Sequence, residues 1–220
     1  MGTFYDNSTI PAELRRNYDV YDRIGELGID LGTFEDRVSS LQGRNICGAV
    51  FHESGLVYLS GIGLGDHQMS DDPERVEHGQ KAGQGCADFH IRTLHWAISC
   101  GGEGGDLNDL LYTVKALGMV VSTDVDFKSG PAVVNGYSYR WQSVFGGGTG
   151  NYASDGLDAG GYAGVHARSA IGGFTGRFSL EPEIIVAIPP DLCRAIIANR
   201  GWIFPLIPSM YDKVLAARQS

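Results

Sequence analysis

The sequence predicts an α/β chain in which a β-sheet is covered by helices. Apolar runs rich in Val, Ile, Leu and Tyr alternate along the chain with segments whose apolar residues recur at steps of three and four. The first pattern is typical of strands and the second of helices. With 220 residues, the chain is long enough to bury one core of ordinary size.

The chain begins with a predicted helix over residues 12–27. Its apolar residues fall on one helical face and Gly28 ends the pattern, the residues being Leu14, Tyr18, Tyr21, Ile24 and Leu27. A β-hairpin follows, because two apolar runs at 46–51 and 56–61 flank the polar turn 52–55. The sheet therefore begins after an N-terminal helical extension.

Two longer helices are predicted to cover the sheet. The first starts at Asp72, before a proline and an acidic residue, and extends through Ser99. Gly83 and Gly85 within it each disfavour a helix by about 1 kcal/mol relative to alanine, so we expect another backbone to pack closely there. The second helix spans 131–145. Between the two, the apolar run 110–121 predicts a buried strand.

The last two strands are predicted at 165–171 and 183–188, joined by a linker that ends at Pro182. Residues 146–164 contain few large aliphatic side chains and predict a long loop. The apolar tail after residue 189 must pack on the domain or on another subunit. The predicted organisation is a helical extension at 1–43, one domain at 44–188 with an insertion at 146–164, and an apolar extension at 189–220.

Composition excludes several classes of function. With 17 Lys and Arg against 26 Asp and Glu, the net charge of -9 disfavours nucleic acids and anionic membranes as partners. No apolar run is long enough for a membrane span and no secretory signal is visible, so we expect a cytoplasmic protein. No metal is expected, because His90 and His95 do not share a helical face and no cysteine or acid completes a set of ligands. No cofactor is expected either. The cysteines form no CxxC pair, which predicts free thiols at Cys47, Cys86, Cys100 and Cys193.

The candidate site rests on an arginine and a glutamate. Arg168 lies in the segment 166–172, and Glu183 follows fifteen residues later at the start of an apolar run. We expect the two to lie side by side at one end of neighbouring strands. A guanidinium group is suited to a carboxylate, and a glutamate can hold or move a proton. A structural ion pair is the alternative. His166, two residues before Arg168, is a proton carrier or an interface histidine.

Several separated segments resemble the YjgF/Rid (reactive intermediate deaminase) family, especially its longer, chorismate-mutase-like branch. Order and approximate spacing agree over residues 20–188. The matching segments are 23–29, 55–61, 114–115, 134–136, 144–146, 166–172 and 183–184. The resemblance implies a mixed sheet with two helices packed on one face. It also implies a homotrimer with a ligand cleft at each subunit interface.

The same resemblance assigns roles to residues. Arg168 matches the arginine that binds the substrate carboxylate, and Glu183 matches the glutamate that positions the water which hydrolyses an enamine or imine to a ketone and ammonia. Ser60 and Gly61 match a strand that lines the cleft. Glu181 competes with Glu183 for the acid role, since the two share one side of a strand.

Two positions depart from the deaminase branch. Ile46 and Ala170 stand where that branch usually has a tyrosine and a cysteine, so the chemistry of the pocket differs. The leading hypothesis is a deaminase, or a relative acting on another C–N or N–O bond of a small carboxylate. A non-catalytic trimeric binding module is the alternative. A ribonuclease is disfavoured by the acidic charge.

Overall fold

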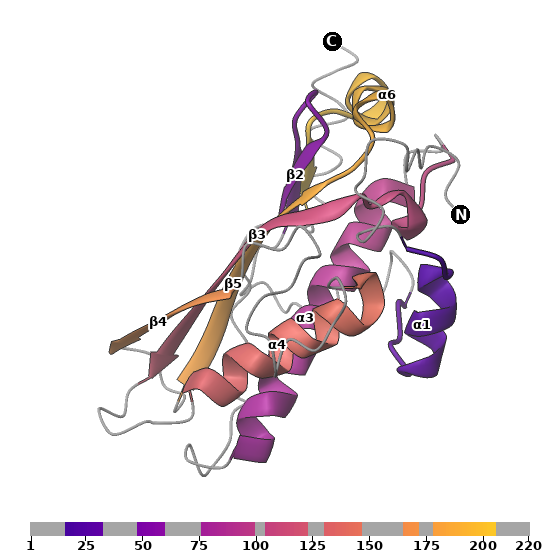
Figure 1. Ribbon diagram of the computed structural model, residues 1–220. Helices are drawn as coiled ribbons and strands as arrows, with labels where there is room; N and C mark the ends of the chain where they lie inside the picture. Colours follow the sequence, from indigo (N-terminus) through magenta and orange to yellow (C-terminus); the bar gives the residue numbers. More distant parts are fainter. Residues whose placement is uncertain are drawn as a thin grey trace.

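The computed structural model describes residues 16–32, 48–59, 76–99, 104–122, 130–146, 165–171 and 178–205. These residues form a six-stranded sheet. Its strands, in chain order, are β1 (Gly48–Phe51), β2 (Leu56–Leu59), β3 (Tyr112–Ser122), β4 (Val165–Ile171), β5 (Phe178–Ala187) and β6 (Ile203–Pro205). Two long helices, α3 (Val76–Ser99) and α4 (Gly130–Phe145), cover one face of the sheet (Figure 1). The predicted fold class is therefore confirmed.

The strand order is β4-β3-β5-β2-β1-β6. All neighbouring strands are antiparallel except β3 and β4, which are parallel, so the sheet is mixed as predicted. The predicted hairpin is formed by β1 and β2. Gly55 closes its turn at φ +93, a conformation that favours glycine, and donates its N–H to the His52 carbonyl oxygen at 2.8 Å.

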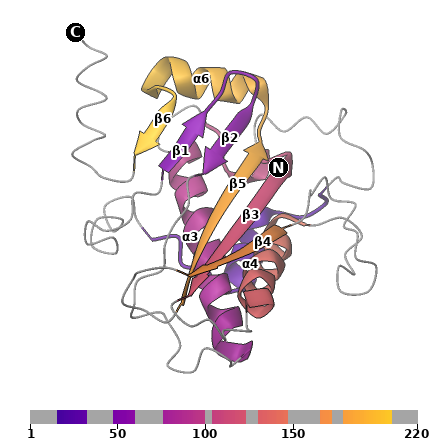
Figure 2. The ribbon, with the colours of Figure 1, turned by 90° about the vertical axis from the view of Figure 1, so that its left-hand side faces the viewer.

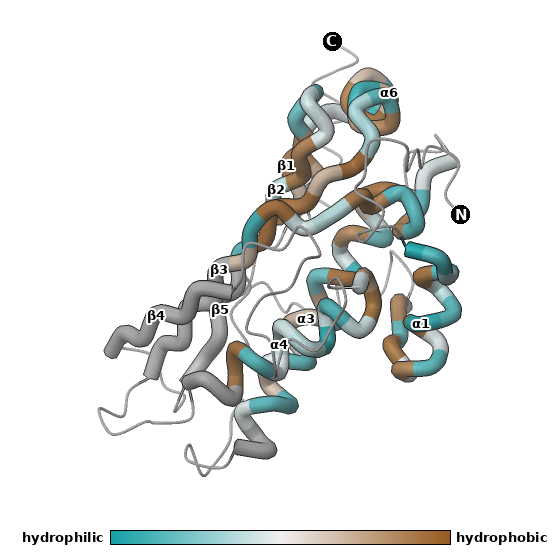
Figure 3. The backbone as a smooth tube through the Cα atoms, viewed as in Figure 1, coloured by the Kyte–Doolittle hydropathy of each residue, from teal (hydrophilic) through white to brown (hydrophobic). Residues whose placement is uncertain are grey.

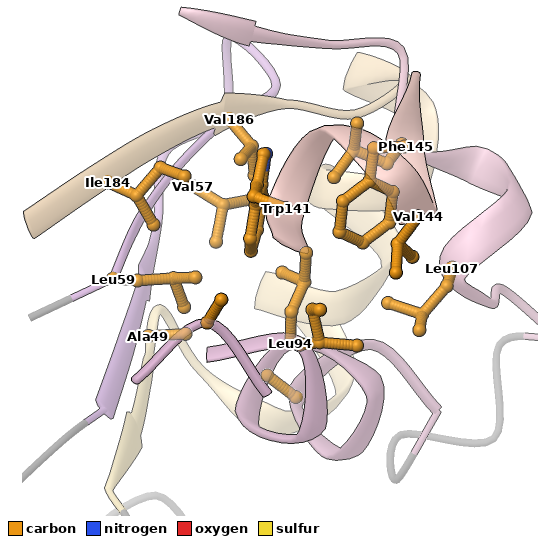
Figure 4. Packing of buried hydrophobic residues seen from close by; sticks show 14 of the residues in the cluster. Ala49, Val57, Leu59, Leu94, Leu107, Trp141, Val144, Phe145, Ile184 and Val186 are labelled. Atoms are coloured by element: carbon orange, nitrogen blue, oxygen red, sulfur yellow. The ribbon is translucent and has the colours of Figure 1, made fainter. Parts of the chain in front are cut away.

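The core lies between the sheet and the helices. Trp141 and Phe145 from α4 and Leu94 from α3 meet apolar residues of the sheet (Figure 4), among them Ala49, Val57, Leu59, Ile184 and Val186. Hydrophilic and hydrophobic residues alternate along the helices in Figure 3, as expected of helices that bury one face. Tyr137 is buried with Trp141, whereas Tyr139 is exposed, so these α4 aromatics are mainly core residues.

The two helices touch through glycine. A Cβ atom on Gly83 would fall against the backbone of Val133 and 2.6 Å from the Tyr137 nitrogen. The close approach predicted at Gly83 is therefore confirmed. At Gly85 that prediction is wrong, because a Cβ there would meet no atom within 4 Å.

The N-terminal helix is shorter than predicted. Helix α1 (Val20–Glu26) begins after Asp19, whose carboxylate accepts the Tyr21 N–H at 2.8 Å. Asn108, in the short 3₁₀ helix η4 (Leu107–Asp109), accepts the Val20 N–H at 2.8 Å. The buried Arg16 donates to the carbonyl oxygens of Asn108 and Leu110. These bonds fix α1 beside η4.

The end of α3 carries a histidine that links it to α1. Tyr21 Oη accepts the Leu107 N–H at 3.3 Å and lies 3.0 Å from His95 Nδ1, so its proton is available to the imidazole. Ser99 Oγ lies 3.4 Å from the same nitrogen. Burial lowers the pKa of His95 below its usual value, and the opposing effect of Asp106 is smaller. The neutral imidazole is thus the form that fits this contact.

We expect this contact to weaken in mild acid. Because the pKa of His95 is lower in the folded than in the unfolded chain, the unfolded chain binds the proton more readily. Stability is therefore lost as the pH falls below the ordinary histidine value and towards the folded one. Urea unfolding at pH 7.5 and pH 5.5 measures the loss, with His95→Gln as control. The same pH dependence in both proteins would contradict the assignment.

The C-terminal part of the described chain packs on the domain. Helix α6 (Pro190–Arg200) is followed by β6, which pairs with β1 and forms one edge of the sheet (Figure 2). Strand β5 is longer than predicted, because residues 178–182, expected to be linker, pair with β3. Pro182 is tolerated there since β2 pairs with β5 only over 184–187, which leaves that part of β5 without a described second neighbour.

None of the described helices is long and apolar enough to cross a bilayer.

Candidate functional site

The residues predicted to form a site lie on β4 and β5. Strand β3 lies between these two strands, so Arg168 and Glu183 are not on neighbouring strands as predicted. That prediction was wrong because β4 enters the sheet parallel to β3, after the α4 crossover, and β5 returns along the other edge of β3. Two strand spacings of about 4.8 Å separate residues on β4 from those on β5.

The register across β3 nevertheless aligns the candidate residues in two rows. Arg168 is opposite Met119, which is opposite Glu181. Two residues away along β3, His166 is opposite Leu117, which is opposite Glu183. Residues in register share a face of a sheet, so all four candidates occupy positions on one face. Glu181 lies directly across from Arg168, and Glu183 is its neighbour in the next row.

This face is the one that the helices leave open. Ala116 and Ile184, which alternate with these rows, are buried against the helices, whereas Glu183 is exposed. Figure 2 looks onto the open face, with β3, β4 and β5 in front of α3 and α4. Glu183 is therefore accessible to water and to a ligand.

The other predicted site residues are placed only in part. Ala170 is opposite Val121 and, two residues beyond Arg168, occupies the same face of the sheet. Ile46, Ser60 and Gly61 lie outside the described residues, as do residues 147–164 of the predicted insertion 146–164. The last described residue of β2 is Leu59, which pairs with Ile184 next to Glu183.

The open face also carries residues that the sequence did not single out. Lys115 is opposite Ile185, and this row continues across the sheet through Tyr58, Val50 and Ile203. Lys115, Tyr58 and Val50 are exposed. In the sequence Lys115 stands out only as part of a short motif. The face of the sheet that it occupies depends on an irregularity in β3 that no sequence pattern predicts.

The histidine and cysteine side chains described next, which lie away from this face, are buried in the fold. His90 Nδ1 lies 2.8 Å from Tyr137 Oη in the core. The thiol of Cys193 donates to the His52 carbonyl oxygen, and burial raises its pKa to about 11, so it is a poor nucleophile. Cys86 is also a buried free thiol. No three His, Cys, Asp or Glu side chains within the described ranges are grouped so as to hold a metal ion.

Solved structures share this fold. One is a crystal structure of a "putative endoribonuclease" from Shewanella oneidensis MR-1, with a TM-score of 0.54 and 16% identity over 78% of this chain and 100% of that one. Another is the protein Atu1372 of unknown function from Agrobacterium tumefaciens, with a TM-score of 0.50 and 19% identity over 77% of this chain and 92% of that one. At such low identity the likeness is one of fold alone.

No family model and no curated protein matches the sequence.

Proposed function

We propose that this chain is a Rid-like hydrolase that converts the enamine or imine of a small carboxylate-bearing metabolite into a ketone and ammonia. Arg168 holds the substrate carboxylate and Glu183 orients the attacking water. The observation that carries the proposal is the alignment of Arg168 and His166 with Glu181 and Glu183 on the open face of one sheet. The exposure of Glu183 and the shared fold support it.

Hydrolysis of an imine requires few catalytic groups from the protein. An iminium carbon is already electrophilic, so a held carboxylate, a placed water and a route for protons are sufficient. The water oxygen bonds to the imine carbon while Glu183 carries one water proton to the nitrogen. The remaining hydroxyl proton is then transferred to the same nitrogen as the C–N bond breaks, which leaves a ketone and ammonia. Glu181 is the alternative acid for this step, since it lies across β3 from Arg168.

The position of β3 favours this role over a structural ion pair. A structural pair on a sheet is expected between directly opposite or diagonal residues of adjacent strands. Here a whole strand separates Arg168 from both glutamates. Binding of a ligand that bridges the two sides of β3 explains these charged residues better than a structural ion pair does.

We also propose that the protein works as a cytoplasmic homotrimer whose ligand cleft lies between subunits. Tyr58, Val50 and Tyr112 are 40%, 36% and 39% exposed on or beside the open sheet face. Such apolar surface on a sheet favours a protein partner, and a second copy of the chain is the partner that the Rid resemblance implies. The net charge of -9 disfavours nucleic acid and anionic lipid as partners.

A non-catalytic trimeric binding module is the second candidate. Ala170 favours it, because this position shares a face with Arg168 and alanine has no group that can move a proton. The name of the Shewanella protein does not extend to this chain, since an acidic protein is poorly suited to bind RNA.

Ammonia release tests the proposal. The protein is incubated with enamines generated in situ by a serine/threonine dehydratase. We expect Arg168→Ala and Glu183→Gln each to lower the rate by about 100-fold or more, because each removes a group that acts on the reacting molecule. Arg194→Ala and Glu26→Gln are matched controls, since both residues form exposed ion pairs within surface helices away from this face.

Equal rates in the wild type and both site variants would contradict the proposal. Binding of small acids that requires Arg168, without any release of ammonia, would identify the module. Intact RNA after incubation with the protein is the expected result for the nuclease activity.

A further inference from the structure

Strand β3 contains a bulge next to the candidate site. Its pairing with β5 shifts by one residue between Thr113, opposite Val186, and Lys115, opposite Ile185. In a regular strand Lys115 would instead pair with Ile184, which is buried against the helices. The extra residue therefore moves Lys115 from the core face to the open face. Bulges next to active sites commonly redirect a side chain in this way.

The bulge is held from both sides. Thr113, just before it, is buried, and its hydroxyl accepts a hydrogen bond of 2.9 Å from Nε1 of the buried Trp141. Ala116, just after it, is buried opposite Ile184. Both neighbours are fixed in the core, so Lys115 has one available direction, towards the open face, where it is exposed.

Lys115 differs from the other cations of the chain. Among the cationic side chains that the structure describes, Lys115 alone has no hydrogen bond, ion pair or ring contact with the described residues. Lys115 is therefore an exposed cation whose ammonium group is free to meet an anionic ligand on the open face.

Lys115 lies close to the candidate site. Glu183 is opposite Leu117, two residues beyond Lys115, so Lys115 and Glu183 are diagonal neighbours on adjacent strands, about 7–8 Å apart. Arg168 is opposite Met119, four residues beyond Lys115, which corresponds to about 14 Å along β3. The two cations thus stand on either side of the row that contains Glu183. A small molecule can reach both through their long side chains.

We propose that Lys115 binds a second anionic group of the substrate, so that the preferred substrate is the enamine or imine of a dicarboxylic acid. One carboxylate binds Arg168, the other binds Lys115, and the reacting carbon lies between them beside Glu183. This inference rests on the proposed function in one respect only, which is the use of Arg168 as the site of the first carboxylate. Lysine binds carboxylate as a compact point charge, so it tolerates some variation in ligand length.

The test is a binding measurement with adipate and hexanoate, which have the same chain length and differ by one carboxylate. Isothermal titration calorimetry of the full chain gives both dissociation constants. We expect the wild type to bind adipate about fivefold or more tightly than hexanoate. Lys115→Met should bind the two equally, and Lys115→Arg should keep the preference. Lys81→Met, an exposed lysine on α3, should behave as the wild type.

Equal affinities of the wild type for the two acids would overturn the inference, and so would a preference for adipate that survives in Lys115→Met. These outcomes do not depend on whether the proposed reaction occurs, because the measurement is of binding and needs no turnover. Selective binding of adipate by a protein that releases no ammonia would support the role of Lys115 in binding and exclude the hydrolase.

Discussion

Gly83→Ala and Gly136→Ala are each expected to destabilise the fold by about 3 kcal/mol or more. These are the residues at which α3 and α4 touch. A Cβ atom on Gly136 would fall against the carbonyl of Gln80 and 2.8 Å from its α-carbon, and one on Gly83 would fall against the carbonyl of Val133. In both cases the obstacle is backbone, which has no rotamer with which to move aside.

The cost is large because the added methyl group forces the two helices apart. Both helices pack on the sheet, and Ile91 and Leu94 from α3 and Trp141 from α4 are fully or almost fully buried. Separation of the helices would loosen these contacts along their whole length. The change therefore propagates well beyond the glycine that is replaced.

Gly85→Ala is the matched control. It lies in the same helix two residues from Gly83, and a Cβ atom there would meet nothing within 4 Å. Alanine favours a helix over glycine, so we expect this variant to be as stable as the wild type or more stable by up to about 1 kcal/mol. Urea unfolding followed by circular dichroism at equal protein concentrations compares the three variants. A midpoint for Gly83→Ala at or above that of the wild type would contradict the packing described above.

Much of this fold follows from patterns in the sequence. Helices at 76–99 and 130–145, the hairpin and the strand at 165–171 lie where apolar periodicity and the glycines predict them. These are local features, set by the repeat of apolar residues along a single element. The small strand β6 was missed because three residues are too few to show a period.

The arrangement of the site was harder to predict. Periodicity shows that Arg168 and Glu183 lie on strands, but not that β3 lies between those strands, because the order of strands depends on contacts between distant segments. The position of Lys115 depends on a single extra residue in β3. A bulge changes the face of every following residue, and the sequence around Val114 carries no signal of it.

Trp141 connects the core to this bulge, and its loss is the second large effect that we expect. Its ring is 1% exposed, stacks on Tyr137 with 6.2 Å between ring centroids, and lies 4.5 Å from the Phe145 ring. Trp141→Ala removes these contacts and leaves a cavity, so it should destabilise the fold by about 3–5 kcal/mol. Trp202→Ala is the control, because Trp202 is 57% exposed and its loss should change stability little.

A milder substitution separates packing from the hydrogen bond. Trp141→Phe keeps an aromatic ring but removes the donor to Thr113, which leaves a buried hydroxyl without this partner at a cost of about 1–3 kcal/mol, in addition to the smaller ring. Thr113→Val removes the acceptor instead.

Because the two single variants break the same bond, their effects should not add in the double variant. If this bond holds the bulge in register, Trp141→Phe should also weaken the preference for adipate over hexanoate while leaving Lys115 intact. Additive losses of stability, with the preference for adipate unchanged, would show that the bulge keeps its register without Trp141.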